Sequence, residues 1–196
     1  MALPALGQSD YPNKPVKFVV PYGAGGGTDQ IARLISSKLS QRLGQAVVVE
    51  NKPGAGTVLG SDYAARQPAD GYTLLLTTSG LTSAPFMVAK LSFDPVKDFT
   101  PVAPLAIMLI SLSASNSVPA NTVQELVAYM KANPNKLNYA SYGVATTNNL
   151  VMSLFNQRAD VQSLHVPYKA GAQALPDLVR GQVHLMFDSM QTSGPL

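Results

Sequence analysis

The fold is decided by residues 16–29, which read Val16-Lys17-Phe18-Val19-Val20-Pro21-Tyr22-Gly23-Ala24-Gly25-Gly26-Gly27-Thr28-Asp29. The first five residues form a β-rich run that ends at Pro21, and they predict a strand. Beyond the glycines, apolar residues recur at helical spacing up to Gly44, at Ile31, Leu34, Ile35, Leu39 and Leu43. This spacing predicts a helix. Strand, glycine-rich loop and helix in succession are typical of the opening unit of an α/β fold.

The same alternation extends outward over most of the chain. Further strands are predicted at 46–50, 72–77, 103–114, 137–141, 164–168 and 183–188. Helices are predicted between them: one through Ala65, one from residue 121 to just before Pro134, one through Leu154, and one at 172–179. The second of these begins with a capping box of Thr122 and Glu125. Apolar strands that alternate with helices indicate parallel sheets covered on both faces. We therefore predict two α/β units in series, 11–101 and 102–192.

The composition excludes several classes of protein. Of the 196 residues, 46% are hydrophobic and 13% are charged, which is typical of a globular protein. The net charge is only +3 and the basic residues are scattered, so we expect no nucleic-acid partner. The most apolar run, 102–114, contains Pro104 and is shorter than the roughly 18 residues that a membrane helix needs. The absence of cysteine excludes disulfides, thiolate metal ligands and cysteine nucleophiles.

The glycine-rich loop at 23–27 is suited to an anion. It precedes a helix N-terminus, where unpaired N–H groups and the helix dipole attract negative charge. The loop is not a Walker A motif, because no Lys-Ser or Lys-Thr follows the glycines. Asp29 stands where a dinucleotide motif would place its last glycine, and its carboxylate would repel a phosphate. We therefore expect backbone amides to hold a carboxylate or another polar solute here; a tight turn without a ligand is the alternative.

Two more hydroxyl-rich loops follow predicted strands. Thr77-Thr78-Ser79-Gly80 ends the third strand, and the loop at 141–147 follows a strand of the second unit. Open α/β sheets bind ligands at the carboxyl ends of their strands, so loops from both units are expected to converge on one cleft. Asp188, at the end of the last predicted strand, either lines this cleft or caps the segment after that strand.

The sequence contains no recognisable catalytic or metal-binding pattern. The α/β-hydrolase motif Gly-x-Ser-x-Gly is absent. His165 and His184 fall inside predicted strands, so we expect both to be buried structural residues rather than metal ligands. We therefore predict a binding protein without a catalytic residue, a metal ion or a cofactor. A small α/β enzyme that acts on an organic acid is the alternative from another class.

A series of motifs runs in order along nearly the whole chain. In the first unit they are Tyr11-Pro12-x-Lys14-Pro15-Val16, Val19-Val20-Pro21-Tyr22-Gly23-x-Gly25-Gly26-x-x-Asp29, Val49-Glu50-Asn51-Lys52-Pro53-Gly54-Ala55-Gly56, Asp70-Gly71-Tyr72-Thr73-Leu74-Leu75 and Asp98-Phe99-Thr100-Pro101-Val102. In the second unit they are Leu137-Asn138-Tyr139-Ala140-Ser141-x-Gly143, His165-Val166-Pro167-Tyr168-Lys169 and Gly181-Gln182-Val183. Together these motifs resemble the Bug family, the periplasmic solute-binding proteins of tripartite tricarboxylate transporters.

The resemblance implies a hinged, two-lobed α/β fold of the type II periplasmic-binding-protein class, which closes on a carboxylic acid and delivers it to membrane transporter subunits. Backbone amides, hydroxyls and ordered water would hold the carboxylate. The implied ligand contacts are Tyr22, Gly23, Ala24, Gly25, Gly26, Thr28, Asp29, Thr78, Ser79, Ser141, Gly143, Ala145, Thr146 and Asp188. Ala145 replaces a glycine of the family pattern and Asn149 a histidine. The ligand's identity therefore does not transfer, and di- or tricarboxylic and aromatic acids all stay open.

Members of the family continue past the point that matches Leu196, and their C-terminal part returns to the first lobe. The resemblance therefore implies an incomplete first lobe, with residues 193–196 beginning the return. Either the chain is truncated, or a second copy completes the lobe in a homo-oligomer, or the open sheet surface invites association. A periplasmic location is implied, with the secretion signal removed or replaced; residues 1–8 either are the end of such a signal or are an ordinary N-terminus. A receptor that presents its ligand to a sensor protein is the alternative function.

Overall fold

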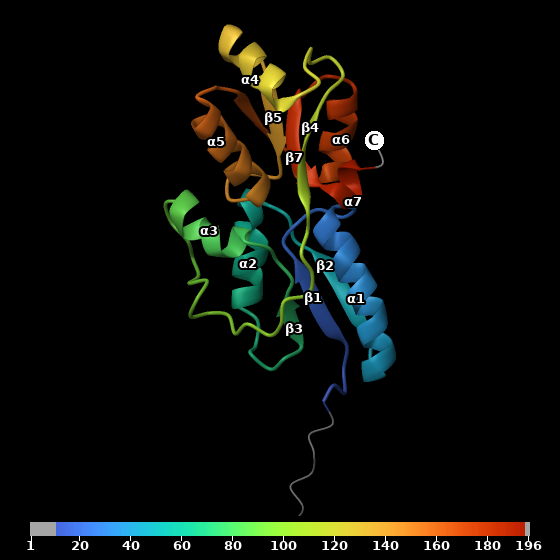
Figure 1. The fold of residues 1–196 in the computed structure, drawn as a ribbon. Helices are drawn as coiled ribbons and strands as arrows, with labels where there is room; N and C mark the ends of the chain where they lie inside the picture. The colour runs from blue at the N-terminus through green and yellow to red at the C-terminus, as the bar shows by residue number, and fades with distance from the viewer. Residues whose placement is uncertain (1–10, 195–196) are drawn as a thin grey trace, which may run out of the picture.

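The chain folds around two separate sheets, as a computed structural model that describes residues 11–194 shows (Figure 1). The first sheet has the order β2-β1-β3 and consists of parallel strands β1 (Val16–Val20), β2 (Val47–Asn51) and β3 (Thr73–Leu75). The second has the order β4-β7-β5-β6, with β4 (Ile110–Ala114), β5 (Asn138–Ser141), β6 (Leu164–Pro167) and β7 (Leu185–Ser189).

Helices connect the strands and cover the sheets. In the first unit they are α1 (Gly27–Leu43), the short 3₁₀ helix η1 (Ala55–Thr57), α2 (Val58–Ala65) and α3 (Gly80–Met87). In the second they are α4 (Val123–Ala132), α5 (Thr147–Ala159), α6 (Gly171–Val179) and α7 (Met190–Ser193). The predicted α/β fold class is confirmed, and the domain boundary near residue 101 stays a prediction.

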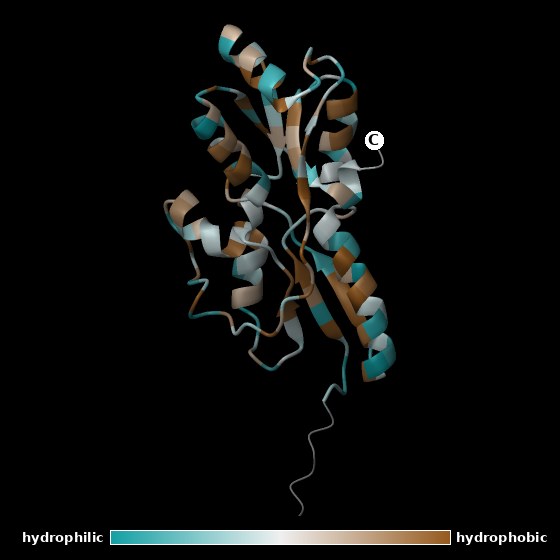
Figure 2. Cartoon of the chain, in the orientation of Figure 1, coloured by the Kyte–Doolittle hydropathy of each residue, from teal (hydrophilic) through white to brown (hydrophobic). Residues whose placement is uncertain are grey.

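Strand β1 forms the core of the first unit because it lies between β2 and β3 and is covered by helices. Val16, Val19 and Val20 are at most 1% exposed, and Ala32 of α1 is fully buried beside them. Figure 2 shows β1 as a largely hydrophobic strand. Burying a valine side chain stabilises a fold by roughly 1.5–3 kcal/mol, so this strand fixes where the glycine-rich loop leaves the sheet.

The core of the second unit is built from side chains of α4, α5 and β7. Met130, Met152, Leu185 and Met186 are all at most 1% exposed. Strand β7 lies in the middle of the sheet, parallel to β5 and antiparallel to β4. This corrects the expectation of a purely parallel second sheet: the chain enters the second unit from the first, so β4 runs opposite to the strands that follow it.

The predicted strand at 103–114 is wrong over most of its length. Only residues 110–114 are a strand, where they pair with β7. Upstream, the apolar run is exposed rather than buried: Val102 is 81% exposed and Ile107 is 90% exposed. A strand needs a hydrogen-bonded neighbour, and the sheet offers one only from Ile110 onward; Pro104 has no N–H to donate in any case.

The expectation that a second copy completes the first lobe stays a prediction.

The structure contains two helices, α3 and α7, that the sequence did not predict. The sequence predicted no helix at 80–87, where Pro85 lies inside α3. Helix α7 follows β7 directly. Residues 1–8, on which the prediction of a former secretion signal rests, lie outside the described residues. Of the return crossing predicted at 193–196, residues 195 and 196 also lie outside them, while Ser193 ends α7; the crossing stays a prediction. Within residues 11–194, none of the helices combines the length and the apolar character that crossing a bilayer requires.

Thr122 caps α4 as predicted, while Glu125 reaches back to the residue before the N-cap rather than to the Thr122 N–H. This cap gives a first testable prediction. The Thr122 hydroxyl accepts a hydrogen bond from the Glu125 N–H at 3.1 Å, and the Glu125 carboxylate accepts one from the Asn121 N–H at 2.7 Å. Replacing Thr122 by Ala leaves the Glu125 N–H without this acceptor, so we expect a loss of about 1 kcal/mol in the free energy of unfolding. Urea denaturation measures the loss. Thr122→Ser, which keeps the hydroxyl, is the control, and an equal loss in both variants would contradict the prediction.

Candidate functional site

A cavity of about 560 Å³ lies between the two units, at the carboxyl ends of their strands. The first unit contributes the residues after β1, the turn after β2 and the end of α3. The second contributes the loops after β5 and β6. The lining residues are Pro21, Tyr22, Pro53, Gly54, Ala55, Gly56, Met87, Val88, Ala89, Tyr142, Gly143, Val144, Pro167, Tyr168 and Lys169. Of the predicted contacts, Tyr22 and Gly143 line this cavity directly.

The glycine-rich loop packs against the second unit instead of forming an open wall. A Cβ atom on Gly23 would lie 2.4 Å from the Ala170 Cβ, and one on Gly27 would lie 2.6 Å from the Ser189 Oγ. The loop therefore approaches the second unit so closely that a Cβ atom on Gly23 would meet the Lys169 backbone oxygen as well, and one on Gly27 would require the Ser189 side chain to move. Ala24 and Gly25, at the tip between them, are exposed.

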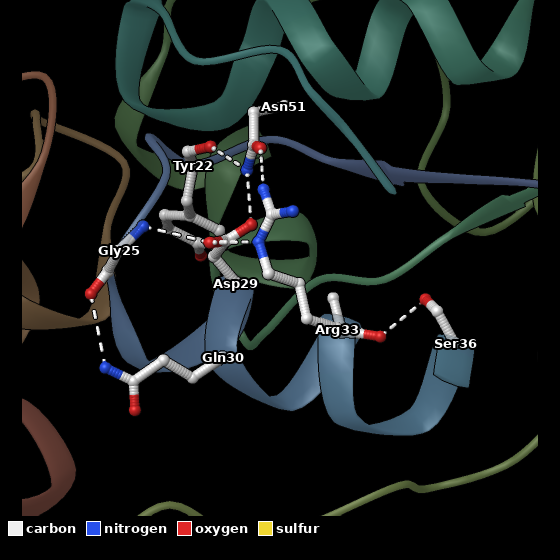
Figure 3. Close-up of polar contacts among 8 residues, drawn as sticks. Tyr22, Gly25, Asp29, Gln30, Arg33, Ser36 and Asn51 are labelled. Atoms are coloured by element: carbon white, nitrogen blue, oxygen red, sulfur yellow. Dashed lines mark hydrogen bonds and ion pairs between the residues drawn. The ribbon is translucent and has the colours of Figure 1, made fainter. Parts of the chain in front are cut away.

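Asp29 turns back onto its own loop, as Figure 3 shows. Its Oδ2 accepts hydrogen bonds from the Gly25 N–H at 2.9 Å and from the Arg33 Nε at 2.9 Å. Its Oδ1 accepts one from the Asn51 Nδ2 at 2.9 Å, and the same Asn51 amide also donates to the Tyr22 carbonyl at 3.1 Å. The Asp29 carboxylate is thus the anion that the glycine loop holds in this structure, and Asn51 joins the loop to the end of β2.

These contacts set the charge state of Asp29. Burial alone would raise the pKa of Asp29, but the hydrogen bonds from Arg33, Gly25 and Asn51 outweigh it and hold this pKa below its ordinary value. Because its pKa is lowered, Asp29 stays ionised at neutral pH although it is only 2% exposed. Its position fits a role in shaping the loop, and Thr28 beside it is also buried.

Hydroxyl groups connect the first unit to the second. The Tyr22 hydroxyl and the Thr78 hydroxyl are 2.6 Å apart, and the Ser79 hydroxyl lies 2.8 Å from the Thr147 hydroxyl at the start of α5. The Thr78 hydroxyl is also 3.5 Å from that of Thr147. Burial raises the pKa of Tyr22, against the opposing effect of its hydrogen bond with Thr78, so the phenol stays protonated. The predicted loops at 77–80 and 141–147 therefore meet, through these hydroxyls.

The loop after β5 is held by its own side chains. The Ser141 hydroxyl accepts a hydrogen bond from the Gly143 N–H at 3.0 Å, and the Thr146 hydroxyl donates to the Gly143 carbonyl at 2.6 Å. Gly143 has a φ of +120°, and a Cβ atom there would lie 2.8 Å from the Gly56 Cα. The backbones of the two units touch at this point. Ala145, one of the predicted contacts, is fully buried against the first unit near Gly56.

Asp188 lies behind the cavity wall. Its Oδ1 accepts a hydrogen bond from the Tyr142 hydroxyl at 2.8 Å, and Thr192 of α7 donates to its Oδ2. Burial and the neighbouring Asp188 charge both raise the pKa of Tyr142, and the hydrogen bond to Asp188 acts in the same direction. Tyr142 lines the cavity, whereas Asp188 is 2% exposed. The carboxylate therefore fixes the tyrosine ring from behind.

The two histidines are only half-buried, which corrects the expectation that both are buried. His165 lies in β6, the edge strand of the second sheet, and His184 lies one residue before β7. The His165 Nε2 is 2.6 Å from the Ser141 Oγ, and the His184 Nδ1 is 2.6 Å from the Asn138 Oδ1. Desolvation lowers the pKa of His165. Among residues 11–194, no group of three or more histidine and carboxylate side chains is placed to bind a metal ion.

Several lining residues were not predicted from the sequence. The turn at 53–56 follows β2 at the same edge of the sheet as the glycine-rich loop, so the rule that ligands bind at carboxyl ends of strands could have identified it. Tyr168 and Lys169 follow β6 in the same way. No such rule points to residues 87–89, which come from the end of a helix.

Comparison with known proteins places the chain in a family of transporter receptors. A family model for the tripartite tricarboxylate transporter family receptor matches residues 31–195. A protein of Pseudomonas sp. (strain P51), the UPF0065 protein in the tcbD-tcbE intergenic region, is 39% identical over 184 residues, which are 92% of this chain and 54% of that protein. The chain spans between 53% and 58% of the length of the curated relatives it matches.

Solved structures agree with this placement. R. palustris Rpa4515 with adipate has a TM-score of 0.90 and 37% identity, covering 95% of this chain and 62% of that one. MatC (Rpa3494) from Rhodopseudomonas palustris with bound malate has a TM-score of 0.87 and 36% identity, covering 94% of this chain and 63% of that one. These likenesses confirm the two-lobed binding-protein fold, and the matched model confirms the resemblance noted in the sequence. The chain belongs to the tripartite tricarboxylate transporter receptor family.

Proposed function

We propose that this chain captures a small carboxylate between its two lobes, as the receptor of a tripartite tricarboxylate-type transporter. The observation that carries the proposal is the cavity of about 560 Å³ that both units line. A ligand enclosed there touches both units at once. Contacts that exist only in the closed arrangement favour closure, so binding and closing are coupled.

The related structures support a carboxylate as the ligand. One was solved with adipate and another with bound malate, and both compounds are dicarboxylic acids. In this chain, Tyr22 and Gly143 are the proposed contacts that line the cavity. The remaining predicted residues of the loops at 22–29, 78–79 and 141–146, together with Asp188, are proposed to shape its walls through the hydrogen bonds and close contacts described above.

The proposed location is the periplasm, and the proposed partners are the membrane subunits of the transporter. Receptors of the matched family work with such transporters. The position of the cavity between the lobes also suits this role, because a docking membrane protein can sense whether the lobes are closed.

Catalysis is not part of the proposed function. The Ser141–His165 pair, 2.6 Å apart, has the components of a nucleophile and its base. Ser141 is fully buried, however, and its hydroxyl oxygen already accepts the Gly143 N–H. No carboxylate of the described residues is hydrogen-bonded to His165 to orient it. The pair is better suited to holding the loop after β5 in shape.

Thermal denaturation with a panel of carboxylic acids tests the proposal. At a concentration of a hundred times its Kd, a ligand stabilises the folded state by about 2.7 kcal/mol, and for a chain of this size we expect the Tm to rise by about 5 °C or more. Adipate and malate belong in the panel, with adipamide as the neutral counterpart of adipate. If none of the acids stabilises a chain that circular dichroism shows to be folded, or if amide and acid act alike, the proposal is wrong.

A further inference from the structure

The loop after β5 carries a proposed ligand contact, and a histidine lies directly behind this loop. The Ser141 Oγ accepts the Gly143 N–H at 3.0 Å and lies 2.6 Å from the His165 Nε2. Ser141 is fully buried and His165 is half-buried. A single side chain therefore connects the imidazole ring to the backbone of Gly143, which lines the cavity.

The imidazole ring also stacks on a second support of the same loop. The ring centroids of His165 and Tyr139 are 4.9 Å apart, and the angle between their planes is 19°. The Tyr139 hydroxyl donates to the Asn149 Oδ1, and the Asn149 Nδ2 donates to the Val144 carbonyl, each at 2.8 Å. Both a neutral and a protonated imidazole stack favourably on a phenol ring. This contact therefore keeps the histidine ring in place whatever its charge.

The distance between Ser141 and His165 identifies the donor in this pair. Hydroxyl donors form bonds of about 2.5–3.0 Å, whereas N–H donors prefer about 2.7–3.2 Å. At 2.6 Å, the Ser141 hydroxyl is the donor and the His165 Nε2 is the acceptor. This requires a neutral ring with its proton on Nδ1. The Ser141 oxygen then stays available to accept the Gly143 N–H.

A proton on the His165 Nε2 disturbs this arrangement. Both nitrogens of a charged imidazole are donors, so the Ser141 hydroxyl must direct its own proton elsewhere. The structure offers it the Gly143 carbonyl, 3.3 Å from the Ser141 Oγ. The two lone pairs of that carbonyl are already used by the Thr146 hydroxyl at 2.6 Å and the Thr146 N–H at 3.2 Å. Protonation of the ring therefore requires Gly143 and its loop to shift.

Burial, rather than a neighbouring charge, governs the titration of His165. The titratable groups of β5, of the end of α5 and of β6 with the two residues after it are Tyr139, Arg158, Asp160, Tyr168 and Lys169. None of the ion pairs within residues 11–194 includes His165, and burial lowers its pKa below the ordinary value of 6.5. The folded chain thus binds this proton less readily than the unfolded chain. The contribution of the neutral ring to stability is complete above about pH 6.5 and is lost as the pH falls toward the folded-state pKa.

We propose, building on the carboxylate-binding function above, that His165 is a positioning residue of the loop after β5 and makes ligand affinity depend on pH. The neutral ring accepts the Ser141 hydroxyl and so fixes Gly143 at the cavity. The protonated ring withdraws this support, and the affinity falls as the surroundings become acidic. A receptor built in this way releases its ligand more readily at low pH.

NMR spectroscopy of the ligand-free chain tests the coupling between the histidine and the loop. We expect the Gly143 amide resonance to shift with pH along the same curve as the His165 ring. Ser141→Ala removes the hydroxyl between them, so the amide is expected to stop following the ring while the ring still titrates. The chain has two histidines, and the second provides the matched control. The His184 Nδ1 is 2.6 Å from the Asn138 Oδ1, at the other end of β5, and His184→Gln is expected to leave the Gly143 curve unchanged.

Calorimetric titration with adipate and with malate, at about pH 7.5 and about pH 5, tests the effect on binding across the range in which histidine titrates. One linked proton changes an affinity by at most about tenfold per pH unit. We expect the wild type to lose about threefold to tenfold more affinity between these two pH values than His165→Gln does. The glutamine amide oxygen can accept the Ser141 hydroxyl but does not titrate, and protonation of the acids themselves affects both proteins equally. His184→Gln is expected to show the pH dependence of the wild type.

The outcomes separate this inference from the function on which it rests. If the Gly143 amide does not follow the His165 ring, or if the wild type and His165→Gln lose affinity equally, the role of His165 is wrong while the receptor function stands. Loss of the pH dependence in His184→Gln would contradict the role of His165 as well. If no acid binds to the folded chain at either pH, the receptor function fails and this inference fails with it.

Discussion

Replacing Gly143 by Ala is expected to separate the two lobes and to abolish tight ligand binding. Gly143 has a φ of +120°, and its new Cβ would lie 2.8 Å from the Gly56 Cα and 3.0 Å from the Gly56 N. Both neighbours are backbone atoms, which cannot rotate away as the end of a side chain can. The strained backbone adds a cost of about 1–3 kcal/mol to the folded state. We expect a larger radius of gyration in solution scattering and an affinity that is about fivefold to 150-fold lower, the range that corresponds to that cost.

Gly44→Ala is the matched control for this prediction. Gly44 also has a positive φ, of +65°, at the end of α1, but a Cβ atom there meets nothing within 4 Å. Its substitution brings only the local strain of a left-handed residue, about 1–2 kcal/mol, and leaves the lobes in contact. Equal radii of gyration and equal affinities in the two variants would show that the contact between Gly143 and Gly56 does not control closure.

Replacing Asp29 by Asn is expected to lower the free energy of unfolding by about 2–3 kcal/mol at neutral pH, the order for hydrogen bonds to a buried charged group. An amide oxygen can still accept the Gly25 N–H. The new NH₂ group, however, must face the donors of Arg33 or Asn51, which now bond to the Asp29 carboxylate at 2.9 Å each. Urea denaturation measures the loss, and the glycine-rich loop before α1 is expected to loosen first.

The same variant has a defined pH dependence. The folded-state pKa of Asp29 lies below its ordinary value, which is about 3.9 in an unfolded chain. The contribution of Asp29 to stability is therefore complete above about pH 4 and is lost as the pH falls through the folded-state pKa. We expect the difference between wild type and Asp29→Asn to shrink below about pH 4.

Asp62→Asn is the control for Asp29. Asp62 pairs with Arg66 at 2.9 Å in the same i,i+4 arrangement, but the Asp62 side chain is 24% exposed whereas that of Asp29 is 3% exposed, and exposed pairs contribute little. We expect a much smaller loss there. An equally large loss in both variants would mean that burial of Asp29 has no special effect.

The opening unit could be predicted from the sequence because the pattern that determines it is local. Five β-rich residues, a glycine-rich loop and helical spacing up to Gly44 predict β1 and α1, and the structure has both. The cap of α4 is local in the same way, since Thr122 and Glu125 are three residues apart. Patterns of this kind predict the structure correctly because each residue interacts with its neighbours along the chain.

The hydrogen bonds within the candidate site could not be predicted from the sequence, because they join residues that are far apart along the chain. Asn51 bonds to Asp29, and Asp188 bonds to Tyr142, across separations of 22 and 46 residues. The glycine-rich loop therefore has the sequence pattern of an open anion cradle, while Asp29 supplies the anion. The apolar run at 102–109 was misjudged for a related reason: its composition predicts a strand, but only the tertiary fold decides whether a neighbouring strand exists.

The position of β7 has a consequence for how the chain reaches its fold during synthesis. β7 lies between β4 and β5, so Ala114 and Tyr139 both align with Leu185. The ribosome must therefore add roughly 70 residues after β4 before its neighbour in the sheet exists, which takes roughly 4–15 s at about 5–20 residues per second. During that interval the polypeptide carries an unpaired strand beside an exposed apolar run, a combination that invites aggregation. The strand order thus makes elongation speed and early chaperone contact determinants of yield.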